Sequence, residues 1–288
     1  MDYHSPASFA EASALAANAT GITRFLAGGT DVLVQLRSEL VTPDTLIDIK
    51  KIDGVSDITR NVDGSWTLGV AATGAEMSEH PELSGDWPGV VEAMDLIGST
   101  QVQGRATLTG NLCNGSPAAD SVPAMVAAGV TVTITGPDGN RTIAAEGIPA
   151  SPGKTTLTKG EVVTAVNIPA RGENGGDAYL RFIPRTEMDI AVVGVGVSLR
   201  LDGDTITEAR VSLGAVAPTV LLVDDCAKAI IGSTLDDVAL DALAAAASAA
   251  CNPIDDKRGT IEFRTEVAGV LAKRAAKIAY ARAKGEQA

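Results

Sequence analysis

Two glycine-bearing segments, well separated in the sequence, constrain the fold of this chain more than any other feature. The first is Phe25-Leu26-Ala27-Gly28-Gly29-Thr30-Asp31-Val32-Leu33, and the second is Ala106-Thr107-Leu108-Thr109-Gly110-Asn111. Glycine accepts positive φ and lets the backbone approach a ligand closely, and a helix N-terminus favours an anion. If the two loops converge, they can hold the pyrophosphate of a dinucleotide without a Rossmann fingerprint. The alternative for Gly28-Gly29 is a tight connection that serves only the fold.

The elements around the first segment predict a compact N-terminal lobe. The apolar run 22–26 predicts a strand, after a helix over residues 8–19. Val32, Leu33, Leu36 and Leu40 recur at helical spacing, which predicts a helix over residues 31–40. We expect Pro43 to end that helix and residues 45–49 to form the next strand.

The composition indicates a folded protein that does not bind polyanions such as nucleic acids. Hydrophobic residues make up 45% and charged residues 20%, which argues against disorder. The net charge is −13 and the isoelectric point about 4.6, so neither a nucleic acid nor an anionic membrane is expected as a partner. No apolar stretch is long enough to span a membrane, and the start of the chain lacks a secretory pattern. We therefore expect a cytoplasmic protein without a membrane span.

The chain has little raw material for metal sites or side-chain catalysis. Its three cysteines, Cys113, Cys226 and Cys251, show no C-x-x-C pairing and are too few for the four ligands of an iron–sulfur cluster. Only His4 and His80 are available as histidines. We expect no metal site and no catalytic residue, so an organic cofactor must carry any redox chemistry. Cys113 is interpreted as a packed residue, with a reactive thiol as the alternative.

The rest of the chain predicts an α+β architecture. Strands are expected at residues 66–70, 130–135 and 162–168, helices at 90–97 and 122–128, and a hairpin turn at 137–140. Residues 171–176 are the best linker candidate. Three strand-like segments follow at 178–184, 191–201 and 207–215, and then helices at 235–251 and 262–284. Gly194-Val195-Gly196 lacks the third glycine of a dinucleotide fingerprint and lies within a strand pattern, so it is interpreted as a site of close packing.

Taken together, the two loops resemble those of the FAD-binding medium subunit of the molybdenum hydroxylase family, which includes xanthine dehydrogenase and carbon monoxide dehydrogenase. The resemblance covers essentially the whole chain. It extends to the segments Tyr3-His4-Ser5-Pro6-Ala7-Ser8, Leu46-Ile47-Asp48-Ile49-Lys50, Glu161-Val162-Val163, Asp189-Ile190-Ala191 and Phe263-Arg264. It implies a two-lobed FAD-binding domain of the vanillyl-alcohol-oxidase/PCMH type over residues 1–175, with lobes of about 1–55 and 56–175. A smaller C-terminal domain over residues 176–288 would combine a three-stranded antiparallel sheet with helices.

Carried over position by position, the resemblance implies a set of cofactor-binding residues for FAD. These are Leu26, Ala27, Gly28, Gly29, Thr30, Asp31, Val32, Leu33, Gly98, Thr107, Leu108, Thr109, Gly110, Asn111, Asp120, Val163 and Arg181. Two departures from the family pattern stand out. Thr109 replaces the first glycine of the usual T-I-G-G-N, and Gln101-Val102-Gln103-Gly104 replaces Q-I-R-N. Because a β-branched residue tolerates positive φ poorly, we expect Thr109 to keep a negative φ.

The resemblance implies an electron-transfer subunit of a heterotrimeric oxidoreductase. A large molybdopterin-binding subunit would oxidise the substrate, and a small subunit with [2Fe–2S] clusters would pass electrons to FAD on this chain. The acceptor would be NAD, a quinone or another compound, and the assembly would be a dimer of heterotrimers. One alternative is a self-contained flavin oxidase of the vanillyl-alcohol-oxidase type. The other is a non-catalytic nucleotide-binding module.

Overall fold

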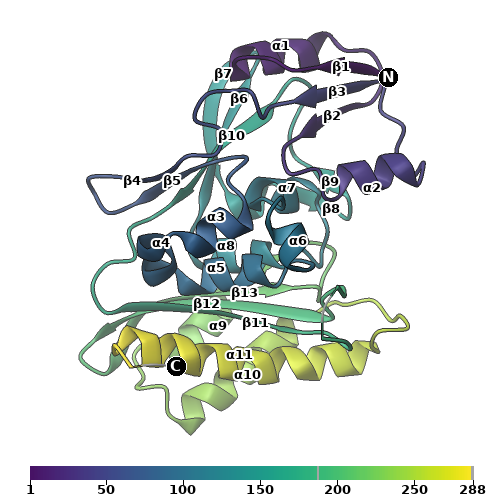
Figure 1. The fold of residues 1–288 in the computed structure, drawn as a ribbon. Coiled ribbons are helices and arrows are strands. Elements are labelled where there is room, and N and C mark those ends of the chain that lie inside the picture. Colours follow the sequence, from purple (N-terminus) through teal and green to yellow (C-terminus); the bar gives the residue numbers. More distant parts are fainter. Residues whose placement is uncertain (187, 287–288) are drawn as a thin grey trace.

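The structure, a computed structural model, describes residues 1–186 and 188–286 of the chain. Three main β-sheets follow one another along the molecule, with short helices between the second and third sheets and long helices beyond the third (Figure 1). A two-stranded sheet of β8 (Pro149–Ser151) and β9 (Lys154–Thr155) adds a small hairpin at one side. The α+β class expected from the sequence is confirmed.

The N-terminal sheet is parallel, with the order β1-β3-β2. Its strands are β1 (Asp2–His4), β2 (Thr23–Leu26) and β3 (Thr45–Asp48), and every residue of β3 is buried. Helix α1 (Phe9–Asn18) begins at Ser8, whose side chain accepts a hydrogen bond from the Glu11 N–H. Its alanines at 12 and 16 are buried against this layer. The predicted strand and helix positions in this lobe are therefore confirmed to within a few residues.

Helix α2 (Val32–Arg37) is shorter than predicted, and Pro43 does not end it. Glu39 takes a positive φ of 57°, and the N–H of Leu40 donates to the carbonyl of Gln35. This left-handed closure ends the helix six residues before the proline. Position 39 holds a glutamate, so no glycine signals this ending in the sequence. No residue of α2 is fully buried, and the helix stands apart from the sheet in Figure 1.

The second sheet is antiparallel, with the order β4-β5-β10-β6-β7. Its strands are β4 (Ile58–Arg60), β5 (Trp66–Gly69), β6 (Thr131–Gly136), β7 (Gly139–Ala144) and β10 (Val162–Ile168). The Pro137-Asp138 turn joins β6 to β7, as the hairpin prediction required, and a single turn of 3-10 helix (Ala145–Gly147) follows β7. Trp66, Leu68 and Ile134 are almost fully buried on this sheet.

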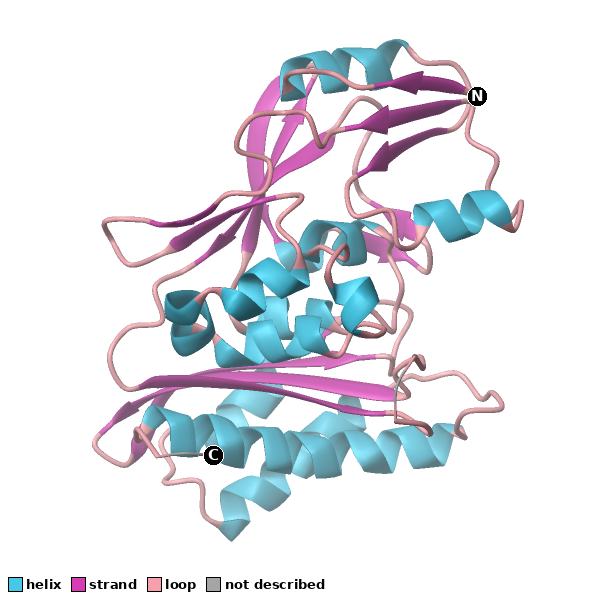
Figure 2. Cartoon of the chain, in the orientation of Figure 1, coloured by secondary structure: helices cyan, strands magenta, loops and turns pink. Residues whose placement is uncertain are grey.

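Short helices lie between the second sheet and the C-terminal sheet (Figure 2). They are α3 (Gly74–Glu79), α4 (Pro81–Asp86), α5 (Pro88–Asp95), α6 (Thr100–Gln103), α7 (Leu108–Cys113) and α8 (Ser121–Ala127). Every residue of α8 is buried. The first two of these helices, α3 and α4, follow one another directly along the chain. The capping box of Thr73 and Glu76 accounts for the first of them.

The C-terminal sheet has four strands, so the prediction of three was wrong. Its antiparallel strands are β11 (Gly175–Phe182), β12 (Val193–Asp202), β13 (Thr205–Gly214) and β14 (Leu221–Leu222). The fourth has only two residues, too few for an alternating pattern to show. Gly175 and Gly176 belong to β11, so the segment between β10 and β11 is residues 169–174, and the predicted linker at 171–176 extends two residues too far.

Helices cover both faces of the C-terminal sheet. α5 and α8 pack on one face, while α9 (Asp224–Ile230) and α11 (Ile261–Ala283) pack on the other, with α10 (Asp237–Ala250) behind them. A Cβ on Gly196 of β12 would lie 2.5 Å from the Pro123 carbonyl oxygen of α8. The interpretation of this glycine as a site of close packing is therefore confirmed. Among the described residues, no helix combines the length and apolar character that a membrane crossing needs.

Candidate cofactor-binding site

A cavity of about 800 Å³ lies where the two glycine-bearing segments meet. This volume falls within the range of about 300–1,000 Å³ that is usual for small-molecule and cofactor sites. The start of β10 and the β8–β9 hairpin complete its walls. The sequence-predicted residues that line it are Ala27, Gly28, Gly29, Thr30, Asp31, Val32, Thr107, Thr109, Gly110 and Val163.

Gly28 holds the two segments in direct contact. The Nε atom of Arg105 donates a hydrogen bond of 3.0 Å to the Gly28 carbonyl oxygen. A Cβ added to Gly28 would lie only 1.9 Å from the carbonyl oxygen of Arg105. No side chain fits there without moving one backbone away from the other. The convergence of the two loops is thus a backbone contact that requires glycine.

Gly29 shapes the turn that presents bare backbone to the cavity. Its φ of +81° is in the left-handed region, where L side chains are strained. Within the described part of the chain, no protein acceptor is recorded for the N–H groups of Gly28, Gly29 and Thr30. Three unused donors at a cavity wall are suited to the oxygens of an anionic group.

The second segment forms the start of α7. The Thr107 side chain caps this helix and accepts a hydrogen bond of 2.9 Å from the Gly110 N–H. Thr109 lies within the helix and is absent from the residues with positive φ, so its expected negative φ is confirmed. The Thr109 hydroxyl is buried and has no recorded partner. Asn111 faces the protein, because its Oδ1 accepts hydrogen bonds from the N–H and hydroxyl of Ser121.

Asp120 and Arg181 form a buried ion pair. The Nη1 of Arg181 lies 2.7 Å from Oδ2 of Asp120, and the Tyr179 hydroxyl donates to the same carboxyl group at 3.3 Å. Burial raises the pKa of Asp120 to about 6, although Arg181 acts in the opposite direction. The structure therefore joins two residues that are far apart in the sequence. It does so outside the cavity lining.

The structure does not place all of the sequence-predicted residues in the cavity lining. Those that lie outside it are Leu26, Leu33, Gly98, Leu108, Asn111, Asp120 and Arg181. A Cβ on Gly29 would lie within about 3 Å of the Leu26 and Leu33 side chains, so these two residues pack directly under the turn. Leu108 is buried in the core, and Gly98 has a φ of +64°.

The cavity also has walls that the sequence reasoning missed. Gln35 of α2 donates a hydrogen bond of 3.2 Å to the Asn114 side chain, so the end of α7 is tied to α2 across the cavity. The basic side chains of Arg24, Lys154 and Lys159 belong to the lining. Lys154 follows a Pro152-Gly153 turn, and this turn is the local signal that the segment is exposed. Nothing in the sequence indicates which cavity the Lys154 side chain would face.

Cys113 lines the cavity beside Asn114. Burial raises the pKa of its thiol to about 12, so the group stays protonated near neutral pH and is a weak nucleophile. This favours the interpretation of Cys113 as a packed residue. Among residues 1–186 and 188–286, the structure shows no cluster of three or more metal-ligating side chains.

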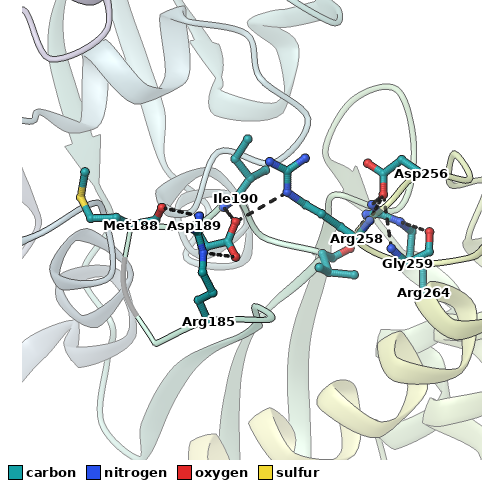
Figure 3. A network of polar contacts seen from close by, with 9 residues as sticks. Arg185, Met188, Asp189, Ile190, Asp256, Arg258, Gly259 and Arg264 are labelled. Atoms are coloured by element: carbon teal, nitrogen blue, oxygen red, sulfur yellow. Dashed lines mark hydrogen bonds and ion pairs between the residues drawn. The ribbon is translucent and has the colours of Figure 1, made fainter.

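Asp189, quoted from the sequence as part of a motif, joins two loops of the C-terminal region (Figure 3). Its carboxylate lies 3.1 Å from Nε of Arg185 and 3.6 Å from Nε of Arg258. In the second loop, Asp256 pairs with Arg264 at 2.8 Å. The residues therefore hold the segment after β11 against the segment before α11, a structural role.

The geometry fits a dinucleotide such as FAD. The cavity has the required size, the first loop offers unused N–H donors, and the contact at Gly28 leaves no room for a Cβ. Three basic side chains in the lining favour an anionic ligand on a chain whose net charge is −13.

Comparison with known proteins agrees with this geometry. A family described as the FAD binding domain in molybdopterin dehydrogenase matches residues 1–171. A second, the CO dehydrogenase flavoprotein C-terminal domain, matches residues 178–279. The chain is 32% identical over 282 residues to the carbon monoxide dehydrogenase medium chain of Hydrogenophaga pseudoflava, covering 98% of both chains. It is 34% identical over 288 residues to that of Afipia carboxidovorans, covering 99% of this chain and 98% of the relative.

A solved structure gives the same result. It is that of the carbon monoxide dehydrogenase from Hydrogenophaga pseudoflava, in a form that lacks the Mo-pyranopterin moiety of the molybdenum cofactor. One of its chains superposes on this chain with a TM-score of 0.93 and 32% sequence identity, and 98% of both chains is covered. Both halves of the sequence and the fold thus match those of these proteins. The chain belongs to the family of FAD-binding medium subunits of the molybdenum hydroxylases.

Proposed function

We propose that this chain binds FAD non-covalently in the cavity between its two glycine-bearing segments and serves as the electron-transfer subunit of a molybdenum hydroxylase. The observation that carries the proposal is the backbone contact between Gly28 and Arg105. This contact brings unused N–H groups of the first loop beside the start of α7. In the proposal, these groups hold the pyrophosphate.

The other residues would position and enclose the cofactor. Val163 and Val32 supply apolar walls, while Lys154 and Lys159 supply positive charge. Leu26 and Leu33 support the turn from below. The Asp120–Arg181 pair is proposed to fix the end of β11 beside the site. When bound, FAD supplies the ability to accept two electrons and to pass them to a second acceptor.

In this proposal the partners carry the remaining chemistry. The relatives are medium chains of carbon monoxide dehydrogenase. By analogy, a large subunit with molybdopterin oxidises the substrate and a small subunit with [2Fe–2S] clusters delivers electrons to this chain. NAD, a quinone or another compound takes them up. The division into domains at 1–175 and 176–288, the vanillyl-alcohol-oxidase/PCMH type of the first, a dimer of heterotrimers and a cytoplasmic location belong to the same proposal.

The test is the flavin spectrum of the purified chain and its response to reductants. We expect a flavin absorbance that is released by acid as free FAD. Dithionite should bleach it, while aldehydes, N-heterocycles and carbon monoxide should leave it unchanged without added subunits. Rapid bleaching by one of these substrates would favour a self-contained oxidase. The absence of any flavin after reconstitution with FAD would favour a non-catalytic module.

A further inference from the structure

Residues 29–42, which include α2, form a strap along one side of the cavity. The strap leaves the N-terminal sheet after β2 and returns to it before β3, and these two strands are neighbours in that sheet (Figure 1). Val32 and Gln35 of the helix line the cavity, and so do Leu40 and Val41 of the returning arm. The helix and the arm that follows it therefore face the same space.

The strap is weakly attached to the rest of the chain. None of its residues is fully buried, and no helix or strand in the described part of the chain packs extensively on α2. Its charged side chains, Asp31, Arg37 and Glu39, make no ion pair with residues 1–186 or 188–286. Elements with so little buried contact open at low free-energy cost.

A single recorded hydrogen bond ties the strap to another wall of the cavity. The Nε2 atom of Gln35 donates to Oδ1 of Asn114 at 3.2 Å, and Asn114 lies at the end of α7 and also lines the cavity. As far as the structure describes the chain, the other recorded hydrogen bonds of the strap join strap residues to one another. The bond between Gln35 and Asn114 thus connects two cavity walls that are 79 positions apart in the sequence.

The backbone on either side of α2 is suited to a hinge. Gly29 precedes the helix with a φ of +81°, and Glu39 follows it with a φ of +57°. Hinges are typically a few positions at the ends of an element, which absorb large changes in φ and ψ. The helix between these two positions can therefore move as a unit.

We propose that the strap must open for FAD to enter or leave the cavity, and that the hydrogen bond between Gln35 and Asn114 is the latch that holds it closed. This inference rests on the proposed function, because it assumes that FAD occupies the cavity. The N–H groups of Gly29 and Thr30, which are proposed to hold the pyrophosphate, belong to the strap itself. Since the latch is a contact of the closed strap and not of the ligand, its loss should speed the entry and the release of FAD alike.

The experiment measures the rates of FAD binding and release for the full chain by stopped-flow flavin fluorescence. Gln35→Leu and Asn114→Leu each remove the latch and keep a side chain of similar size. The net worth of one hydrogen bond corresponds to about a fivefold change, so each variant should bind and release FAD about fivefold faster. The Kd should stay nearly unchanged, and the double variant should be no faster than either single variant. Asn167→Leu is the matched control, because it removes a bond of 3.1 Å to Oγ1 of Thr133 in the second sheet and should leave both rates unchanged.

The possible outcomes separate the latch from the proposed function. Unchanged rates in both single variants, or additive effects in the double variant, would overturn the latch and leave FAD binding intact. A weaker Kd with an unchanged rate of binding would show that Gln35 is only a wall contact.

Amide hydrogen exchange gives a readout that needs no FAD. In the apoprotein, Gln35→Leu should speed exchange in residues 29–42 and leave exchange in β10 unchanged, and equal exchange in the variant and the parent chain would refute the latch. Failure of the parent chain to bind FAD would instead overturn the proposed function and the role of the strap in FAD entry. The exchange measurement would still decide whether Gln35 holds the strap closed.

Discussion

Alanine at Gly28 and at Gly29 should have different consequences, although the two glycines are adjacent. At Gly28 the new Cβ would meet the Arg105 carbonyl oxygen at 1.9 Å, whereas ordinary non-bonded contacts need about 3.5 Å. The two backbones would have to separate by about 1.5 Å, which displaces the N–H donors of one loop relative to the other. Loss of two hydrogen bonds to charged oxygens, at about 1.5 kcal/mol each, predicts about a hundredfold weaker FAD binding.

At Gly29 the added Cβ meets only side-chain atoms of Leu26 and Leu33, at 2.9 and 3.0 Å. The main cost there is the φ of +81°, about 1–2 kcal/mol for a residue with a Cβ. Gly64 is a matched control, because it has a φ of +82° in the β4–β5 hairpin, outside the cavity lining. Gly29→Ala and Gly64→Ala should destabilise the apoprotein similarly, and only the former should weaken FAD binding, by less than Gly28→Ala does.

The assay is titration of the apoprotein with FAD, followed by flavin fluorescence, together with urea unfolding of each apoprotein. A Gly28→Ala variant that binds FAD within threefold of the parent chain would refute the idea that the backbone contact between the loops builds the site. Equal losses of affinity in Gly29→Ala and Gly64→Ala would show that global destabilisation, and not the turn, controls binding.

Three further outcomes are expected. Thr109→Gly should change FAD affinity by no more than about 1 kcal/mol, because Thr109 already has negative φ; a gain of several kcal/mol on titration would show strain. Gln35→Leu should cost about 1 kcal/mol of FAD-bound stability by breaking the bond to Asn114, and unchanged thermal unfolding would contradict this. Burial raises the pKa of Asp177 from 3.8 to about 7, although Arg282 acts in the opposite direction. Between these two pKa values the folded chain holds a proton that the unfolded chain has released. The free energy of unfolding therefore falls as the pH rises towards 7. Between pH 5.5 and 8 the parent chain should lose about 2 kcal/mol that Asp177→Asn keeps; parallel urea midpoints would refute this.

The sequence predicted the elements whose signals are local. The helix at residues 8–19 has a serine cap, and the strands at 66–70 and 162–168 have alternating or continuous apolar patterns, so each was found nearly in place. The errors come from signals that local patterns do not contain. Glu39 ends α2 in a left-handed conformation usually taken by glycine, and β14 is visible only through its pairing with Ser212 and Leu213.

The features of the site also divide into those with a local sequence signal and those that depend on tertiary packing. The two glycine loops were recognised because glycine reports backbone conformation directly, and Gly29 does take a positive φ. The contact between Gly28 and Arg105 joins segments 77 positions apart, and that between Gln35 and Asn114 joins segments 79 positions apart. Such pairings depend on how the sheets and helices pack, and no spacing rule in a single sequence contains them. For the same reason the basic wall of Arg24, Lys154 and Lys159 was not predicted.

Helix α2 lies at the cofactor cavity and has little packing of its own. Its inner side lines the cavity and its outer side is exposed, and with no fully buried residue it has little packing of its own to hold it in place. Elements with few buried contacts open at low free-energy cost. FAD bound in the cavity should therefore order α2, so this helix should open less readily in the FAD-loaded chain than in the apoprotein.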